Sequence, residues 1–516
     1  MCVKRIGILG LIIIFISLVP MVAAWAGEVS GGFEGAFGPS ISPSPRFHEM
    51  HEPRTRPGVD AIRRWNEIAI NASGLDHTPV APGENRVFGE QLGPTRSSRA
   101  MAIAHIAIFD VVNAIVGGFH GYTGIPAVHA ASLDAAVAQA AHDVLVALYP
   151  SQSGSFDMLL AEDFSQIRDG RFKTNGMALG QKAAAAILAL RANDGSQVPD
   201  PHVGVDFATS DEPGRWRMDP ISQSTLALGA FWGAVKPFVM TSGDQFRVPL
   251  PPAPNSPEYT DTFKYVKAIG GDGIVTPTIR TAEQTEIGIY WGYDGMPSLC
   301  APPRLYNQIA VHIADQMQTT SKVIEFARLL ALVNVAIADA GIAIWESKYF
   351  YNYWRPVTGI READEGTGPT GAGDGNAETV ADATYSPLGA PASNLDGPNF
   401  TPPFPSYPSG HAGFGGALFQ TLRNFYGTDE IAFTFVSDEF NGVTLGNDGV
   451  VRPLIPRSFS SLSQAEDENG QSRLYLGIHW VFDKTEGIAQ GRRVADYVFE
   501  HAIMPLHEHG QGHNDQ

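Results

Sequence analysis

The sequence predicts an all-α fold in which two packed helix bundles form one large domain. Apolar residues recur at helical spacing through long stretches of the chain from residue 61 onward. Alanine and leucine dominate these stretches, and the alternation of β-branched residues that is typical of strands is scarce. No two segments stand out as a pair of strands. Hydrophobic residues make up 44% of the 516 residues, which is enough for a large core and excludes a disordered chain.

The chain begins with the features of an export signal. Lys4 and Arg5 precede an apolar stretch at 6–19, and Ala-Trp-Ala at 24–26 has the small side chains of a cleavage site. We therefore expect residues 1–26 to be a signal peptide and the mature protein to be exported, either to the periplasm or out of the cell. The alternative is an N-terminal anchor that is not cleaved, although the apolar stretch is short for a membrane span.

Helical periodicity follows a leader at 27–58, which is rich in Gly, Ser and Pro and is expected to be flexible. The helical domain is predicted over 59–505, and its N-terminal half over 59–255. The helical stretches of this half are 61–72, 97–116, 133–148 and 176–193. A loop-like region with scattered aromatic residues, 199–257, leads into the second half.

The C-terminal half, 256–505, is predicted to be a bundle that carries the functional site. Its helical stretches are 282–293, 305–319, 322–354, 410–426 and 479–502. Thr281 and Gln284 predict a capping box at the start of the first of them. A long insertion rich in Gly, Ala, Thr and Asp occupies 366–397.

The stretch 322–354 is apolar on most faces, as expected for either a buried core helix or a membrane span. Arg328, Asn334 and Asp339 interrupt it, which favours a buried helix. No other segment after the leader reaches the roughly 18 uninterrupted apolar residues of a span. We therefore expect no membrane span in the mature chain.

The formal charge of −19 argues against a broad nucleic-acid-binding surface, although it allows a small basic pocket. If the signal is cleaved, Cys300 is the single cysteine that remains, so no intramolecular disulfide forms. The fold then depends on its core, on a ligand or on oligomerisation. The sequence leaves the oligomeric state open and allows a homo-oligomer.

Three short segments carry the residues of a candidate site. In the first, Lys348 and Arg355 are seven residues apart, and Pro356 disfavours helix at the residue before it. On one continuous helix both cations would share a face with Trp345 and Asn352. Two cations at the end of an apolar helix need an anion or water. Alone, this pattern also fits a basic edge whose side chains extend to solvent.

The second segment, Pro408-Ser409-Gly410-His411, precedes an apolar helical stretch and predicts a loop that leads into a helix N-terminus. Free N–H groups at such a terminus bind oxyanions. Ser409 adds a hydroxyl, and Gly410 lets the backbone come close to the ion. His411 is placed to move a proton there. Taken alone the match is weak evidence, because Ser-Gly-His also occurs in ordinary turns.

The third segment contains Ser472, Arg473, His479 and Asp483. His479 and Asp483 are four residues apart and would share a helix face, where the carboxylate fixes the imidazole tautomer and raises its basicity. Arg473 lies six residues before His479, so the two converge only if the chain bends, and Gly477 permits a bend. The alternative is a buried His–Asp pair that stabilises a helix start.

The order and spacing of the three segments are more specific than any one of them. Together they resemble the pattern of the superfamily of vanadium-dependent haloperoxidases and type 2 phosphatidic acid phosphatases. That pattern is Lys-x6-Arg-Pro, then Pro-Ser-Gly-His, then Ser-Arg-x5-His-x3-Asp, and this chain has every element in order. The resemblance implies a two-bundle helical fold and a pocket for a tetrahedral oxyanion, lined by Lys348, Arg355, Ser409, Gly410 and Arg473.

Two activities are known in this superfamily, and the resemblance implies different roles for the same residues in each. In a haloperoxidase the counterpart of His479 binds the vanadium of one vanadate per chain. The counterpart of His411 accepts a proton from hydrogen peroxide, and that of Lys348 donates to an oxygen at the metal. In a phosphatase the counterpart of His479 attacks phosphorus, and that of His411 protonates the leaving group.

Several features favour the haloperoxidases. The chain is long and begins with an export signal, whereas many of the phosphatases are shorter and embedded in membranes. Trp345 precedes Lys348 by three residues and Phe404 precedes His411 by seven, which is similar to the aromatic pair on the halide side of fungal chloroperoxidases. The resemblance therefore implies oxidation of halide by hydrogen peroxide to hypohalous acid, which halogenates a small organic acceptor. The alternatives are an exported acid phosphatase and an oxyanion-binding protein without turnover.

Overall fold

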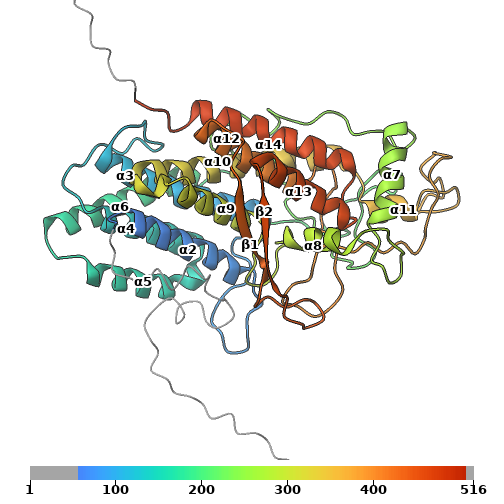
Figure 1. The fold of residues 1–516 in the computed structure, drawn as a ribbon, viewed down its shortest axis with the longest axis horizontal. Helices are drawn as coiled ribbons and strands as arrows, with labels where there is room; N and C mark the ends of the chain where they lie inside the picture. The colour runs from blue at the N-terminus through green and yellow to red at the C-terminus, as the bar shows by residue number, and fades with distance from the viewer. Residues whose placement is uncertain (1–55, 507–516) are drawn as a thin grey trace, which may run out of the picture.

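The computed structural model describes residues 56–506. The predicted signal peptide at 1–26 and residues 27–55 of the predicted leader lie outside the described residues. Within them the fold is all-α, as the sequence predicts, with thirteen α-helices and one two-stranded antiparallel sheet. The N-terminal helices gather at one end of the molecule, and α7 and α11 lie at the other (Figure 1).

The N-terminal half contains five α-helices. They are α2 (Val59–Asp76), α3 (Gly93–Val116), α4 (Leu133–Leu148), α5 (Ser153–Gln166) and α6 (Arg171–Arg191). Four of the five were predicted, and α4 has its predicted bounds because Ser132 accepts a hydrogen bond from the Ala135 N–H and caps its start. The sequence did not predict α5, whose periodicity is weak.

The C-terminal half contains eight α-helices and both strands. The helices are α7 (Pro257–Ile269), α8 (Ala282–Tyr290), α9 (Pro302–Gln316), α10 (Val323–Tyr351), α11 (Pro356–Arg361), α12 (Gly410–Tyr426), α13 (Leu462–Tyr475) and α14 (Val481–His501). The predicted capping box of Thr281 and Gln284 is present at the start of α8, and α12 has its predicted bounds. Three helices were missed: α7, α11 and α13.

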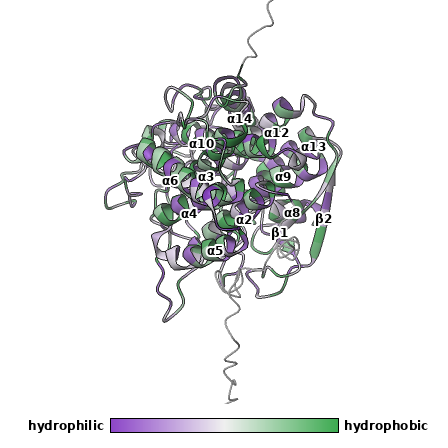
Figure 2. Cartoon of the chain, turned by 90° about the vertical axis from the view of Figure 1, so that its left-hand side faces the viewer, coloured by the Kyte–Doolittle hydropathy of each residue, from purple (hydrophilic) through white to green (hydrophobic). Residues whose placement is uncertain are grey.

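The strands β1 (Phe433–Asn441) and β2 (Leu454–Phe459) form an antiparallel pair that the sequence did not reveal. A long loop joins the two strands, so the sequence between them lacks the two-residue turn that indicates a tight hairpin. Their register is interrupted between Val436 and Asn441. Figure 2 shows β2 at the outer edge of the molecule, and most of its residues are at least partly exposed.

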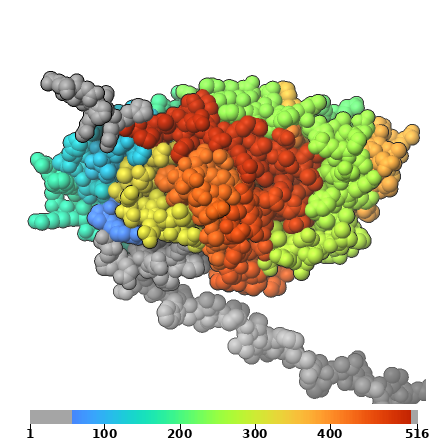
Figure 3. Space-filling view, turned by 45° about the horizontal axis from the view of Figure 1, so that its top comes forward, coloured from blue at the N-terminus to red at the C-terminus, as the bar shows by residue number. Residues whose placement is uncertain are grey.

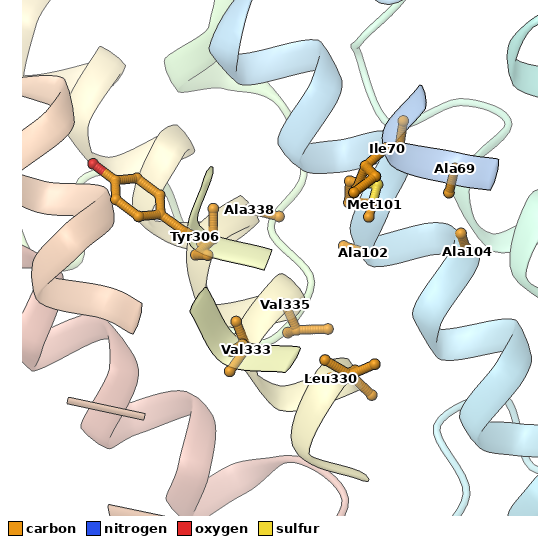
Figure 4. Packing of buried hydrophobic residues seen from close by; sticks show 14 of the residues in the cluster. Ala69, Ile70, Met101, Ala102, Ala104, Tyr306, Leu330, Val333, Val335 and Ala338 are labelled. Carbon is orange, nitrogen blue, oxygen red and sulfur yellow. The ribbon is translucent and has the colours of Figure 1, made fainter. Parts of the chain in front are cut away.

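Helix α10 is the central element of the core, which agrees with the buried helix predicted at 322–354. It packs against α3 of the N-terminal half and against α12 and α14 of the C-terminal half. One hydrophobic cluster continues through both halves, with small side chains such as Ala102 of α3 and Ala338 of α10 (Figure 4). Helices α3 and α10 are long and apolar enough to cross a membrane, but their most apolar windows are 83% and 100% buried inside the protein.

Glycines allow α12 and α14 to approach closely. A Cβ atom added to Gly491 of α14 would lie 1.9 Å from the carbonyl oxygen of Gly413 in α12, and one added to Gly416 would lie 2.6 Å from that of Ile488. Such contacts are possible only without side chains. These two helices cover part of the surface in the space-filling view (Figure 3). Their close packing brings the start of α12 next to the start of α14, and both starts carry predicted site residues.

Candidate active site

The three predicted segments meet where α10 ends and where α12 and α14 begin. Lys348 lies in the last turn of α10 and is completely buried. Its Nζ donates to the carbonyl oxygens of Pro405, at 2.8 Å, and Ser406, at 2.9 Å, in the segment that leads into α12. The side chain therefore extends toward that segment and does not form a basic edge at the surface.

Arg355 reaches the same place by a different route from the predicted one. Helix α10 ends at Tyr351 because Asn352 adopts a left-handed conformation, with φ of 51°. Arg355 is extended, and Pro356 starts α11 rather than merely ending the previous element. The predicted stripe on one continuous helix is therefore wrong.

The Arg355 guanidinium is 1% exposed and turns inward. Its Nε donates to the carbonyl oxygen of Phe404 at 2.9 Å, and its Nη1 donates to that of Ile478 at 2.8 Å. The same Nη1 lies 2.9 Å from Nε2 of His479. Lys348 and Arg355 thus converge across a helix break.

His479 lies just outside α14, because Trp480 is the N-cap of that helix. Its contact with Asp483 is nevertheless made, with 2.8 Å between Nδ1 and Oδ2. The same carboxylate oxygen accepts a hydrogen bond from the Trp480 N–H at 2.9 Å and another from the Ser406 hydroxyl. Because Nδ1–H donates to Asp483, the lone pair of His479 is on Nε2, beside Arg355.

Ser409 and Gly410 form the start of α12. The Ser409 hydroxyl oxygen is the N-cap and accepts from the Ala412 N–H at 3.4 Å, which leaves its proton available for another partner. Gly410 is the first helical residue, so its N–H has no acceptor within the helix. A Cβ atom added to Gly410 would lie 3.3 Å from the Trp345 ring, so the Gly410 backbone lies close to the aromatic side of the site.

His411 is held by the loop that follows α8. Its Nε2 lies 2.6 Å from the carbonyl oxygen of Gly292, so Nε2–H donates there and Nδ1 carries the lone pair. The carbonyl oxygen of His411 accepts hydrogen bonds from Tyr306 and Asn469, each at 2.9 Å. The Gly292 carbonyl therefore orients the His411 ring, while Tyr306 and Asn469 fix the backbone of the same residue.

Arg473 lies in the last turn of α13 and is 1% exposed. The chain turns back toward the site at Gly477, with φ of 71°, where a Cβ would lie 2.5 Å from the Gly270 carbonyl oxygen. The Nη2 atom of Arg473 donates to Asp294 Oδ1 at 2.6 Å. Its Nε and Nη1 atoms are buried and have no hydrogen-bond partner among the described residues.

These contacts bury three basic side chains in one cluster. Lys348, Arg355 and Arg473 face two carboxylates, Asp294 and Asp483, and all five side chains are almost completely buried. Burial, together with the neighbouring arginines, lowers the pKa of Lys348 well below its usual value, whereas Asp483 acts in the opposite direction. Burial also lowers the pKa of Arg355 to about 9 and raises that of Asp483 to about 6.

Both imidazoles are neutral in this environment. Burial and the Arg473 charge lower the pKa of His411 well below its ordinary value, although its hydrogen bond to Gly292 opposes the shift. Burial, followed by Arg355 and Lys348, does the same for His479. For both imidazoles burial is the largest cause of the shift in pKa, and the nearby cations add to it.

A cavity of about 160 Å³ opens onto this cluster. His411, His479 and Arg473 line its polar side, while Trp345 and Phe404 lie on its apolar side with their ring centroids 5.0 Å apart. Lys348 Nζ lies 5.0 Å from the centre of the Phe404 ring. The predicted aromatic pair is therefore in contact, next to the cations.

The donor set fits a bound oxyanion. Burying cations and N–H donors without hydrogen-bond partners costs free energy unless an acceptor is bound. A tetrahedral oxyanion supplies such acceptor atoms. No group of three or more His, Cys, Asp or Glu side chains that could hold a metal ion occurs within residues 56–506. The arrangement is therefore one imidazole nitrogen with surrounding cations, which suits vanadate or phosphate rather than a free divalent metal.

Two contributors to the site were missed or left undecided. Ser406, which donates to Asp483, lies in a loop with no sequence signal beyond its neighbouring prolines. The spacing of Asp294 in the sequence does not place it at the site. The Asp-Gly pair at 294–295 indicates a turn, but only the fold shows that this turn contacts Arg473.

Comparisons with known proteins agree with this geometry. Residues 328–508 match the family model described as VCPO second helical-bundle domain. The chain is 30% identical to the vanadium chloroperoxidase of Curvularia inaequalis, over 86% of this chain and 81% of that protein.

Solved structures give the same fold. A bacterial vanadium-dependent iodoperoxidase, described as the first of its kind, matches with a TM-score of 0.64 and 24% identity, over 86% of this chain and 95% of that one. The holo form of a bacterial vanadium-dependent chloroperoxidase matches with a TM-score of 0.57 and 16% identity, over 82% and 95% of the two chains.

Proposed function

The chain belongs to the vanadium-dependent haloperoxidase family, and on that premise we propose that it oxidises halide with hydrogen peroxide to hypohalous acid, which halogenates a small organic acceptor. The proposed cofactor is one vanadate per chain. We further propose that the protein acts after export, as its N-terminal sequence predicts. Its partners are then small molecules, with no nucleic acid among them.

One observation carries this proposal: the charges of Arg355, Lys348 and Arg473 all act on His479, with Arg355 Nη1 2.9 Å from its Nε2, and two donor atoms of Arg473 have no partner among the described residues. In the proposal, Lys348, Arg355 and Arg473 bind vanadate oxygens by charge-assisted hydrogen bonds. The Ser409 hydroxyl and the Gly410 N–H donate to the same ion, and His479 Nε2 is the ligand to vanadium. When bound, vanadate supplies a Lewis acid for the oxidation of halide by peroxide, without a change in its own oxidation state.

The contacts of Asp483, Ser406 and Trp480 prepare His479 for this role. Asp483 accepts from Nδ1–H and so holds the tautomer whose lone pair points at the cations. Ser406 and the Trp480 N–H fix that carboxylate in turn. The ring needs no proton transfer before it binds the ion.

His411 is the proposed base for the proton of hydrogen peroxide. Its Nε2–H is committed to the Gly292 carbonyl, so the proton is accepted at Nδ1. Burial and the neighbouring cations keep the pKa low, and the ring is therefore free to accept at neutral pH. Trp345 and Phe404 would exclude water from the halide side, and Lys348, next to the Phe404 ring, would donate a hydrogen bond to the bound ion.

The proposed function is tested with purified protein supplied with vanadate, bromide and hydrogen peroxide, and with a diketone dye as acceptor. We expect bromination that requires all three additions. Phosphate release from a phenyl phosphate without bromination would instead support the phosphatase that shares this pocket.

The His411→Ala variant separates an enzyme from a binding protein. Removing the base is expected to lower the bromination rate by about 10²–10⁴-fold, while vanadate binding measured by calorimetry changes little. A variant that brominates as fast as the parent would rule out His411 as the base. Vanadate binding by the parent protein without any turnover would indicate a pure oxyanion-binding protein.

A further inference from the structure

The loop 293–300, which lies between α8 and α9, brings a methionine to the cavity. Met296 lines the same cavity as His411, His479 and Arg473. It is the one sulfur-containing residue among the lining side chains, and it is only 8% exposed. The catalytic proposal gives this side chain no role.

The loop is held rigidly although its backbone is strained. Tyr293, Ser298 and Cys300 adopt left-handed conformations, with φ of 52°, 66° and 57°. Such conformations persist only where surrounding contacts determine them.

The contacts that fix this loop come from both halves of the protein. Asp294 is bound by Arg473, the Tyr293 N–H donates to Glu439 at 3.0 Å, and the Ser298 N–H donates to the Thr78 hydroxyl at 3.0 Å. At the end of the loop, Cys300 Sγ lies 2.9 Å from the Ser73 hydroxyl in α2. Met296 therefore lies in a fixed position at the cavity wall and is not part of a mobile segment.

We propose that Met296 is a modification site, whose thioether is oxidised to the sulfoxide by hypohalous acid formed in its own cavity. This inference rests on the proposed function, which supplies the oxidant. The sulfur lone pair attacks the halogen, an S–halogen bond forms, and the halogen–oxygen bond breaks to release hydroxide. Water then adds to sulfur, and halide and two protons leave. Sulfur loses two electrons, and the halogen gains the same two.

Met296 is a better target than Trp345, which lines the same cavity. The Trp345 ring is covered by Phe404 and Phe414, with centroids 5.0 and 5.9 Å away, and its indole N–H donates to the Leu228 carbonyl at 3.0 Å. The Met296 sulfur keeps both lone pairs and is the softer nucleophile. The sulfoxide would add a polar oxygen to the apolar wall, next to the residue that binds Arg473.

Three exposed methionines serve as internal controls. Met218, Met317 and Met504 are 37%, 39% and 37% exposed, so an oxidant that arrives from bulk solvent meets them before it meets Met296. Oxidant formed inside the cavity meets Met296 first. The order of oxidation among these four residues therefore reports where the oxidant originates.

The experiment maps added oxygen by peptide mass spectrometry after turnover of the full-length protein with vanadate, bromide and peroxide. Free methionine in excess destroys hypobromous acid that escapes, and a diketone dye in a parallel sample reports bromination. We expect Met296 to gain one oxygen several-fold faster than any of the three exposed methionines. Omitting bromide should abolish this gain. Reagent hypobromite added to vanadate-free protein should oxidise the exposed methionines first.

The Met296→Leu variant, with similar volume, should keep bromination, lose the added oxygen on that peptide, and lose activity more slowly during turnover than the parent and the Met317→Leu control. An unmodified Met296 in a protein that brominates the dye overturns the inference, as does oxidation of Trp345 in its place or oxidation of Met296 by peroxide alone. If the dye is not brominated, the proposed function fails and this inference fails with it. Should the variant not fold, the mass measurement on the parent protein decides.

Discussion

Two buried charged sites, one in the middle and one at the end of helix α10, differ in how their hydrogen bonds are completed. Asp339, near the middle of the helix, accepts hydrogen bonds from the backbone N–H groups of Phe238, Val239 and Met240, at 2.6 to 2.9 Å. Lys348, near the end, donates to two backbone carbonyl oxygens but belongs to a cluster in which Arg473 of α13 has two donors without a partner among the described residues. Both groups are completely buried. A buried charge that serves the fold is completed by the protein itself, whereas the cluster around Lys348 is complete only with an added anion.

The largest expected effect comes from the satisfied group. In Asp339→Ala, three buried N–H groups lose their acceptor, and we expect the free energy of unfolding to fall by about 3 kcal/mol or more. Chemical denaturation measures the loss. In protein that remains folded, the affinity for vanadate should stay unchanged, because the site contains no atom of Asp339.

An exposed carboxylate gives the matched control. Asp467 is 69% exposed and pairs with Lys484 at the surface, so Asp467→Ala should cost less than about 1 kcal/mol. Equal losses of unfolding free energy in the two variants would mean that Asp339 stabilises the fold no more than a surface carboxylate does. That result would contradict the comparison.

The second effect is on Arg473, which has unsatisfied donors in the cluster around Lys348. In Arg473→Gln the donors that we assign to the anion are lost, and we expect affinity for vanadate, measured by calorimetry, to fall by about 10–100-fold. Stability without vanadate should fall as well, because the buried carboxylate of Asp294 loses its partner, so the affinity is measured on protein shown to be folded.

Arg492→Gln is the control for that change, because this arginine pairs with Glu466 away from the cavity and is 43% exposed. It should leave the affinity for vanadate unaltered. If folded Arg473→Gln protein binds vanadate as tightly as the parent, then Arg473 has only a structural role and its donors do not bind the anion.

The contrast between apolar and polar burial also explains which helices could be predicted from the sequence. The apolar periodicity of α3, α4, α10 and α12 is continuous, and the bounds of α4 and α12 follow from their capping residues. Helix α13 carries almost no apolar periodicity, because its buried residues include Glu466, Asn469 and Arg473. Hydrophobic patterns reveal elements that bury apolar faces, and they miss an element that buries polar groups for the site.

The residues of the site could be named from the sequence, but their geometry could not. Order and spacing brought Lys348, His411 and His479 together as candidates. Helical spacing gave the wrong reason for two contacts, since Arg355 follows a helix break and His479 precedes its helix. The contacts of Asp294 and Ser406 depend on how distant loops pack, which no local pattern encodes.

The smallest expected effect concerns pH. Since His411 and His479 have pKa values well below 6.5 in the folded protein, the unfolded chain binds more protons as the pH falls below 6.5. The contribution of these two histidines to the free energy of unfolding of the vanadate-free protein should therefore decrease as the pH falls through that range, by up to about 1.4 kcal/mol per pH unit for each histidine. Asp483 opposes this between 3.8 and about 6, because its pKa is raised and the folded state binds the additional proton there. The histidine contribution is given by the difference in slope between the parent and a histidine variant.

Denaturation curves between pH 7 and pH 5 measure this slope. We expect His411→Gln to flatten it and His501→Gln, a change at an exposed position, to leave it unaltered. An unchanged slope in His411→Gln would show that this imidazole takes up a proton as readily in the folded chain as in the unfolded one. The imidazole would then not be the buried neutral base that the cations and the Gly292 carbonyl define.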